Sequence, residues 1–199
     1  MIKFIFDLDG TITKQETLPL IAENFGVQHE ISQLTQETVQ GNIPFIESFI
    51  RRVHLLGELS VSSISNLLIK VPLYDRVLEF IRMHLDDCVI ATGNLDCWSE
   101  QLTRIVGCTS YFSHARVEMD KVVKLETILR KEQIVRMYKE QGYKVVFIGD
   151  GNNDLEAMRL ADVAIATGLT HFPSKSILPV SDYLIFNEIT LCRLLNQLY

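Results

Sequence analysis

Cysteines are few in this chain, and they are not spaced as metal ligands or as a redox pair. Its four cysteines form neither a CxxC pair nor a zinc-ligand pattern; they are Cys88, Cys97, Cys108 and Cys192. Such a set predicts ordinary thiols in the reducing environment of the cytoplasm.

Long hydrophobic runs and clusters of basic residues are also missing. No apolar run approaches the ~20 residues of a membrane-spanning helix, so no membrane partner is expected. The net charge is -6, and the lysines and arginines form no cluster of the kind that neutralises nucleic-acid phosphates. The composition therefore argues against a nucleic-acid partner and is compatible with a cation-binding site.

What is present is the pattern of an α/β protein. A hydrophobic fraction of 47% with 22% charged residues supports a globular core. Short apolar runs typical of buried strands alternate with helical patterns, and this alternation predicts a doubly wound parallel sheet. The expected strands are residues 2–6, 88–92, about 111–115, 144–149, 163–167 and 183–186. Helices are expected near 96–106, 125–141 and 153–161, and at the end of the chain.

One long stretch near the start has no strand pattern. Between 14 and 73 the apolar residues recur at helical spacing, as in Leu18, Ile21, Ala22 and Phe25, and Ser60 stands where a helix cap is expected. This stretch predicts a helical insertion over the site. The expected division is therefore an α/β core of residues 1–13 and 74–199 and a small helical-bundle cap of residues 14–73.

Polar clusters follow three of the expected strands. They read "DLDGT" after the first, "TGN" (92–94) after the second, and "GDGNND" (149–154) after the fourth. Each alone could be a turn, but ligands in open α/β sheets bind beyond the carboxyl ends of strands. Four carboxylates gathered there would repel one another unless a divalent cation compensates them, and oxygen ligands favour Mg²⁺. They are Asp7, Asp9, Asp150 and Asp154.

These segments resemble a known family. "FDLDGTIT", "ATGN", a lysine upstream of a strand, and "VVFIGDGNNDLEAM" are similar to the four motifs of the haloacid dehalogenase superfamily, in its phosphoserine-phosphatase-like branch. The resemblance implies a Rossmann-like fold and a phosphatase that forms an aspartyl phosphate. It implies Asp7 as nucleophile and Asp9 as general acid and then base. Mg²⁺ would be held by the Asp7 side chain, the Asp9 carbonyl and Asp150, with Asp154 close by through water.

The resemblance also implies a set of phosphate-binding residues. They are Gly10, Thr11, Thr92, Gly93, Asn94, Lys131 and Asn153. Asn94 departs from the family, which often has a second glycine there. Lys121, Lys124 and Lys131 all lie upstream of Asp150; the family's lysine precedes a helix, which selects Lys131, while a surface lysine with a buried stem is the alternative.

Substrate recognition is expected from the insertion. By the same resemblance Glu16 binds an amino group and Arg52 binds a carboxylate. Phe45 lies seven residues before Arg52, on the same face of the expected helix, and is expected to close over the ligand. Carboxylate–ammonium and guanidinium–carboxylate pairing make this physically sensible. The alternative is that Glu16 is an ordinary first-turn acid and Arg52 a solvated residue. The stretch 115–129 does not clearly resemble the short hairpin that many members carry.

The expected function is a Mg²⁺-dependent hydrolase that converts L-phosphoserine to serine and phosphate. A phosphatase or phosphotransferase for another small metabolite, such as phosphohomoserine or a methionine-salvage phosphoester, fits the same residues. A catalytically silent, phosphate-binding regulatory module is the non-enzyme alternative. The expected partner is a small phosphorylated metabolite, and the chain is a monomer or homodimer. Its five histidines show no spaced pair that would indicate a metal site.

Overall fold

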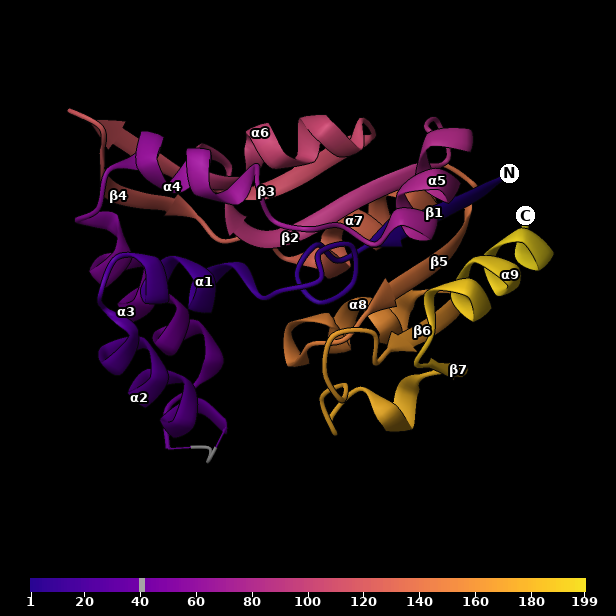
Figure 1. Ribbon diagram of the computed structural model, residues 1–199. Coiled ribbons are helices and arrows are strands. Elements are labelled where there is room, and N and C mark those ends of the chain that lie inside the picture. The colour runs from indigo at the N-terminus through magenta and orange to yellow at the C-terminus, as the bar shows by residue number, and fades with distance from the viewer. Residues whose placement is uncertain (40–41) are drawn as a thin grey trace.

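A seven-stranded sheet forms the centre of the computed structural model, which describes residues 1–39 and 42–199. The strand order is β4-β3-β2-β1-β5-β6-β7 (Figure 1). The strands are β1 Ile2–Phe6, β2 Cys88–Leu95, β3 Thr109–Glu118, β4 Lys121–Thr127, β5 Lys144–Gly149, β6 Val163–Thr167 and β7 Tyr183–Ile185. All neighbours pair in parallel except β3 and β4, which confirms the predicted α/β class.

Helices cover both faces of this sheet. Successive side chains of a strand point to opposite faces, and in β1 Phe4 and Phe6 join one buried cluster while Ile5 joins the other. The first cluster includes residues of α5 (Asp75–Met83), α6 (Asp96–Val106) and α9 (Glu188–Leu198). The second includes residues of α7 (Lys131–Glu140) and α8 (Leu155–Leu160). The sheet is therefore doubly wound.

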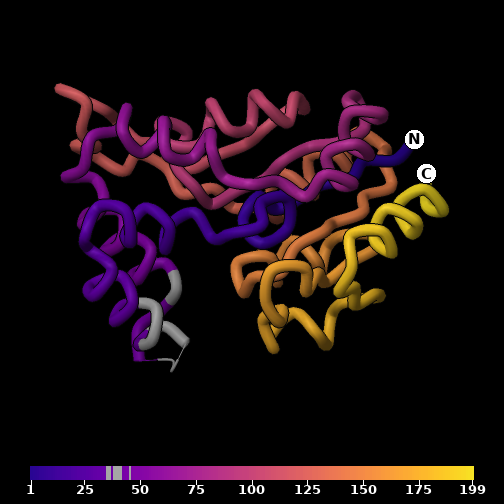
Figure 2. Tube along the Cα trace, in the orientation of Figure 1, coloured from indigo at the N-terminus to yellow at the C-terminus, as the bar shows by residue number. Residues whose placement is uncertain are grey.

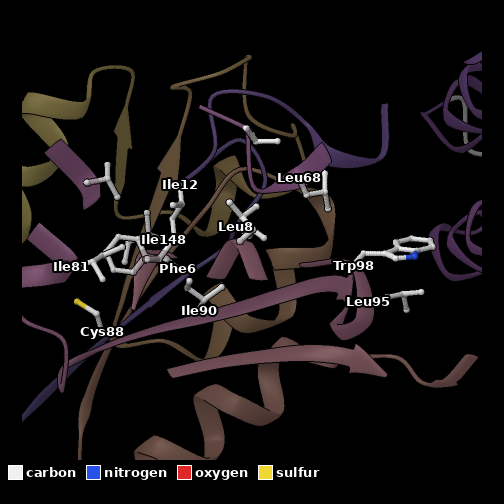
Figure 3. Close-up of a cluster of buried hydrophobic side chains, with 14 of the residues drawn as sticks. Phe6, Leu8, Ile12, Leu68, Ile81, Cys88, Ile90, Leu95, Trp98 and Ile148 are labelled. Atoms are coloured by element: carbon white, nitrogen blue, oxygen red, sulfur yellow. The ribbon is translucent and has the colours of Figure 1, made fainter. Parts of the chain in front are cut away.

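The first cluster also anchors the loop that follows β1. Figure 3 shows Leu8 and Ile12 of this loop among buried side chains that include Phe6 and Ile148, and both loop residues are fully buried. Burying such a side chain contributes about 1.5–3 kcal/mol. Because Leu8 and Ile12 are held on either side of Asp9, the loop that carries the two aspartates has little freedom to move.

The topology directs this loop to the switch point of the sheet. Strand β1 pairs with β2 on one side and with β5 on the other. The chain first winds toward β2 and β3 and later returns to the opposite side of β1, so a crevice forms beyond its carboxyl end. Asp7 is the first residue after β1 and lies at this point.

Among the described residues between β1 and α5, the chain forms four helices. They are α1 Thr17–Asn24, α2 Gln28–Val39, α3 Phe45–Gly57 and α4 Val61–Leu68. Figure 2 shows the first three gathered beyond the end of the sheet, whereas α4 packs against α6. The predicted cap at Ser60 is confirmed, because its hydroxyl oxygen accepts a hydrogen bond from Ser63 N at 3.0 Å. Within the described ranges, no helix is long and apolar enough to span a bilayer.

The prediction was wrong between 115 and 129. This stretch forms the hairpin of β3 and β4, and the helix expected from 125 begins only at Lys131. Its two-residue turn has left-handed backbone at Met119 (φ 47°) and Asp120 (φ 62°). Such turns usually carry Asn-Gly or Asp-Gly. Without a glycine the sequence showed no hairpin signal, and the turn is supported instead by contacts with α4.

Asp120 provides these contacts. Its carboxylate accepts hydrogen bonds from Ser60 Oγ, Ser62 N and Ser62 Oγ at 2.5, 2.9 and 2.6 Å, and its carbonyl accepts one from Val61 N at 2.8 Å. We expect Asp120→Ala to lower the midpoint of thermal unfolding, because α4 loses acceptors at its N-terminus and alanine tolerates the left-handed turn poorly.

Circular dichroism melting of Asp120→Ala beside Glu118→Ala measures this effect. Glu118 lies in the same hairpin and pairs with Arg116 on the surface. Equal midpoints for the two variants would show that the contacts of Asp120 with α4 contribute nothing.

Candidate active site

Asp7 is held at the end of β1 by backbone and by an ammonium group. Its backbone N donates to Ile148 O at 2.8 Å, and its Oδ1 accepts from Leu8 N at 2.7 Å. Lys131 Nζ lies 2.7 Å from the same oxygen. Burial raises the pKa of Asp7 well above its ordinary value, while Lys131 acts in the opposite direction. The result is a fixed, poorly solvated carboxylate that faces the crevice.

Lys131 is the first residue of α7 and is only 2% exposed. Its Nζ lies 2.6 Å from Asp154 Oδ1 as well as close to Asp7. Burial favours the neutral amine, but the two carboxylates raise the pKa of Lys131 above its ordinary value, so it stays an ammonium. Lys121 and Lys124, the two other lysines considered in the sequence, are exposed on β4.

Asp9 is oriented by two donors. Thr17 N, at the start of α1, donates to Asp9 Oδ1 at 2.8 Å, and Asn94 Nδ2 donates to Asp9 Oδ2 at 2.6 Å. Burial and the nearby charge of Glu16 raise the pKa of Asp9 to about 7. A carboxyl group with this pKa can both give and take a proton near neutral pH.

Asp150 and Asp154 follow β5. Asp154 is fully buried, and its Oδ2 accepts from Asp150 N at 3.0 Å and Gly151 N at 2.9 Å, which closes the turn after the strand. Asp150 is 4% exposed, and burial raises its pKa to about 6. One oxygen from each of Asp7, Asp150 and Asp154 lies within 4.8 Å of the other two. This surplus of buried negative charge on hard oxygen donors fits a divalent cation such as Mg²⁺.

The polar cluster "TGN" (92–94) lies within β2, which continues to Leu95. Thr92 is fully buried, and its hydroxyl oxygen accepts from Asn94 N at 3.2 Å. Asn94 Nδ2, besides bonding Asp9, lies 2.8 Å from Thr17 Oγ1. The departure from a second glycine therefore has a structural use, because Asn94 ties β2 to the Asp9 loop and to α1.

Gly10 and Thr11 take part in the hydrogen bonding of their own loop. Gly10 has φ +66°, and its N donates to Thr13 Oγ1 at 3.3 Å. Thr11 is fully buried, with its Oγ1 3.2 Å from Thr167 Oγ1. Asn153, in the short turn after β5, faces the cavity described next.

A cavity of about 460 Å³ opens over these groups. Its polar lining includes Asp7, Asp9, Gly93, Asn94, Lys131, Asp150 and Asn153, together with Glu16, Arg52 and His171. Its apolar lining is Leu18, Pro19, Phe49, Ile128 and Leu129. The cavity therefore joins the edge of the sheet to helices α1 and α3.

Glu16 and Arg52 reach this cavity from the helical segment. Glu16 is the residue before α1, and Arg52 is half-buried on α3, where its Nε donates to Ser48 O at 3.3 Å. Burial lowers the pKa of Arg52, and the charge of Glu16 opposes that shift. The two residues thus share one cavity with Asp7 and Asp9. The side chain of Phe45, the third residue expected to bind substrate, lies outside the described part of the chain.

His171 is a cavity residue that the sequence did not indicate. It follows β6, and its Nε2 lies 2.8 Å from Glu16 Oε1 and 3.0 Å from Asp150 Oδ2. These hydrogen bonds raise the pKa of His171 to about 11. No spacing rule links residues so far apart in the chain. The sequence could have indicated His171 only through its position shortly after the strand β6, because the other polar clusters also follow strands at this edge of the sheet.

A doubly wound sheet with buried aspartates and a lysine at its switch point defines the class of Rossmann-like α/β enzymes. Within this class, the chain belongs to the haloacid dehalogenase-like hydrolases, whose family model matches residues 4–162.

Curated relatives with similar sequences are phosphoserine phosphatases. The Methanocaldococcus jannaschii phosphoserine phosphatase is 23% identical, over 81% of this chain and 83% of its own length. The Archaeoglobus fulgidus phosphoserine phosphatase is 25% identical, with 51% of its length matched. A probable phosphoserine phosphatase of Schizosaccharomyces pombe is 27% identical over 98% of this chain and 68% of its own length.

Solved structures of the same fold are similar over nearly the whole chain. A substrate-bound phosphoserine phosphatase has a TM-score of 0.81 at 21% identity and covers 99% of this chain and 98% of its own. A phospho-aspartyl intermediate analogue of phosphoserine phosphatase has a TM-score of 0.77 at 21% identity, covering 94% and 95%. At this level of identity the likeness concerns the fold.

Proposed function

We propose that the protein is a Mg²⁺-dependent phosphoserine phosphatase that works through an aspartyl phosphate on Asp7. The observation that carries this proposal is that Glu16 and Arg52 line the same cavity as Asp7 and Asp9. Residues 14–73 act as a cap in this proposal, and residues 1–13 and 74–199 form the catalytic core. The free state of the four cysteines supports the reducing cytoplasm as its compartment.

In the first step Asp7 attacks the phosphorus atom. Asp7 Oδ1 is held by Leu8 N and Lys131, so Oδ2 is the attacking atom in this proposal. The bond from Asp7 to phosphorus forms as the bond from phosphorus to the ester oxygen breaks. Asp9 donates its proton to the departing oxygen, since an alkoxide is a poor leaving group.

In the second step Asp9 acts in the opposite sense. Its carboxylate takes a proton from a water molecule, and the water oxygen attacks the phosphorus of the aspartyl phosphate. Phosphate leaves, the Asp7 carboxylate returns, and Asp9 is protonated again. Thr17 N and Asn94 Nδ2 hold the Asp9 carboxyl group throughout, which supports its use in both steps.

Asp7, Asp150 and the backbone carbonyl of Asp9, with Asp154 nearby, would hold Mg²⁺. When bound, the ion screens the nucleophile from the phosphate charge and stabilises the charge that develops on the phosphoryl oxygens. We assign the phosphate itself to the ammonium of Lys131 and to the polar groups expected from the sequence. These are Gly10, Thr11, Thr92, Gly93, Asn94 and Asn153.

The amino acid part of the substrate is assigned to Glu16 and Arg52. We expect Glu16→Gln and Arg52→Lys each to lower kcat/KM for L-phosphoserine by about 10- to 100-fold, since a hydrogen bond to a charged group is worth about 1.5–3 kcal/mol. Turnover of p-nitrophenyl phosphate, which has neither an ammonium nor a carboxylate, should change by less than about threefold when each protein is measured at its own pH optimum. The optimum must be matched because the charge of Glu16 raises the pKa of Asp9, and Glu16→Gln removes that charge.

Two exposed neighbours serve as matched controls. Glu23 is exposed on α1, and Arg51 is the exposed neighbour of Arg52 and pairs with Glu47. The control variants are Glu23→Gln and Arg51→Lys. Both control variants should keep the kcat/KM of the unaltered protein for L-phosphoserine and for p-nitrophenyl phosphate. Equal losses for both substrates in the Glu16 and Arg52 variants would remove these residues from amino acid recognition.

A second candidate is supported by the apolar side of the cavity. Leu18 and Pro19 from α1, Phe49 from α3, and Ile128 and Leu129 before α7 face the same space. These side chains favour a phosphoester with a larger apolar part, such as phosphohomoserine or a methionine-salvage phosphoester.

Phosphate release across a panel of metabolite phosphates, with and without Mg²⁺, tests the proposal. Selective, Mg²⁺-dependent turnover of L-phosphoserine supports it. Selective turnover of a larger ester supports the second candidate, and transfer to an added alcohol would make the protein a phosphotransferase. Binding of phosphate without any turnover would indicate a regulatory module.

A further inference from the structure

We propose that His171 is a positioning residue for substrate recognition, which fixes the carboxylate of Glu16 at the cavity wall so that Glu16 selects esters that carry an ammonium group. The part that Glu16 plays in this inference rests on the proposed function. His171 follows β6 and lines the cavity together with Glu16. It takes no part in the two steps of phosphoryl transfer described above.

His171 bridges Glu16 and Asp150 with one ring nitrogen. Its Nε2 lies 2.8 Å from Glu16 Oε1 and 3.0 Å from Asp150 Oδ2. A carboxylate oxygen only accepts hydrogen bonds, so Nε2 is the donor in both contacts. The imidazolium and one neutral form of the ring both carry a hydrogen on Nε2, so the bridge requires no particular charge on His171. Oε1 is the oxygen that His171 holds, and the ammonium of the substrate is assigned to Oε2.

Glu16 needs such a donor to stay in this position. One of its oxygens lies within 4.8 Å of an oxygen of Asp150, and two carboxylates at this distance repel each other. Gly10 permits the approach, because a Cβ atom there would lie 3.0 Å from Glu16 Oε1 and 2.5 Å from Asp150 Oδ2. The Glu16 side chain is 39% exposed and has several rotatable bonds, so other orientations are open to it. Without His171 it should turn away from Asp150 toward solvent.

The segment that carries His171 is itself fixed at both ends. We call residues 168–174 the β6–β7 segment. At its start, Gly168 N donates to Ile185 O at 2.8 Å. At its end, Ser174 N donates to Asp150 O at 2.8 Å. His171 therefore approaches the cavity from a segment that is tied to the sheet and to the turn after β5.

Thr170, the residue before His171, ties this segment to the connections between the sheet and the helical segment. Its Oγ1 lies 3.2 Å from the carbonyl oxygens of Gly10 and Thr13, on the path into the helices. The same oxygen lies 3.2 Å from Tyr74 Oη, on the path back. The β6–β7 segment thus holds the chain on both sides of the helical segment, and His171 contacts Glu16 from this fixed base.

The expected consequence concerns substrate binding rather than the chemical steps. A Glu16 side chain that is already ordered does not have to be fixed when the substrate binds, and such preorganisation strengthens binding. The contact with the ammonium is assigned to the substrate and the transition state alike. Its weakening should therefore raise KM and leave kcat unchanged.

The test compares two esters that differ only in the ammonium group. One is L-phosphoserine, and the other is the phosphate ester of β-hydroxypropionate, in which a hydrogen replaces the amino group. We call the ratio of their kcat/KM values the ammonium selectivity. A substitution that acts through Asp9, Asp150 or bound Mg²⁺ affects both esters, so its effect cancels in this ratio.

His171→Ala should lower the ammonium selectivity about tenfold through the KM of L-phosphoserine, because Glu16 must then be ordered against the repulsion of Asp150. His171→Gln should keep the selectivity within about threefold of the unaltered protein, since its amide nitrogen can donate at a similar reach. His114→Ala is the matched control. His114 is an exposed histidine that pairs with Asp96 at 2.7 Å, and its loss should leave the selectivity unchanged.

A double-mutant cycle shows whether His171 acts through Glu16. Adding His171→Ala to the Glu16→Gln protein should change the ammonium selectivity by less than about twofold, because residues that act through one another are not additive. An equal loss in both backgrounds would overturn the proposal, as would unchanged selectivity in His171→Ala. A His171→Gln protein as unselective as His171→Ala would also overturn it, since the donor would then have no effect.

A failure of the proposed function gives a different result. An unaltered protein that hydrolyses neither ester, or both equally, does not recognise the amino group, and the proposed function is then removed. Crystal structures of the unaltered protein and of His171→Ala decide the positioning role in that case. A Glu16 side chain that has turned away in the variant supports it, and an unmoved Glu16 overturns it.

Discussion

Asp7→Asn is expected to lower phosphate release at least about 1000-fold for every ester that the protein hydrolyses, because loss of a covalent nucleophile removes the main reaction path. An amide oxygen is too weakly nucleophilic to attack phosphorus. The amide keeps the size of the side chain and an oxygen that can accept from Leu8 N and Lys131, so the loop after β1 should stay in place.

The same substitution should not destabilise the fold. Burial raises the pKa of Asp7, which means that its negative charge is unfavourable in the folded protein, with Asp150 and Asp154 adding to the repulsion. Removing that charge relieves part of the repulsion. We therefore expect a midpoint of thermal unfolding equal to or above that of the unaltered protein, in metal-free buffer.

Steady-state phosphate release and a melting curve for each protein measure both effects. Asp75→Asn is the matched control, since Asp75 is an exposed aspartate paired with Lys14 on the surface. It should leave activity unchanged. An Asp7→Asn protein that is folded and fully active would place the nucleophile elsewhere.

Lys131→Met is expected to damage both stability and activity. Lys131 is 2% exposed and lies within hydrogen-bonding distance of Asp7 and Asp154, so its loss leaves two buried carboxylates without their ammonium. Breaking a buried ion pair from one side costs about 3–5 kcal/mol. Protonation of a carboxylate recovers part of this loss, and the protonated group is then no nucleophile.

The pH dependence of the Lys131→Met rate follows from the direction in which Lys131 shifts the pKa of Asp7. Lys131 lowers the pKa of Asp7, so its removal raises that pKa further. The carboxylate of Asp7 then exists only at higher pH. The rate of Lys131→Met should therefore fall most at neutral pH and recover partly as the pH rises.

Lys139→Met provides the comparison for Lys131→Met. Lys139 pairs with Asp162 at 2.8 Å, but its side chain is 38% exposed, and a solvated pair contributes about 0–1 kcal/mol. Denaturant unfolding of both variants measures the difference. An equal decrease in the free energy of unfolding for the two variants would show that the buried position of Lys131 adds no stability.

The strands of the α/β core could be predicted because their signal is local. The run "IKFIF" matches β1 at Ile2–Phe6, since a parallel strand buried on both faces must be apolar throughout. The hairpin of β3 and β4 could not be predicted in this way. Its turn at Met119 and Asp120 has no glycine, and its support comes from Ser60 and Ser62 of a distant helix.

By itself the sequence determined where the acidic groups gather. Asp7 and Asp150 directly follow two expected strands, with Asp9 and Asp154 in the turns after them, and the carboxyl ends of parallel strands lie at the same edge of a sheet. This inference needs no knowledge of side-chain positions. It depends only on the direction in which the strands run.

Only the tertiary structure decided which residues complete the site. The sequence favoured Lys131 only through a family resemblance, and the structure gives the physical reason: α7 begins at Lys131 and places its ammonium beside the carboxylates, while Lys121 and Lys124 are exposed on β4. The contact of Glu16 with His171 joins residues 155 positions apart. Such contacts depend on how helices and loops pack over the sheet, and packing is a property of the whole chain that no local pattern encodes.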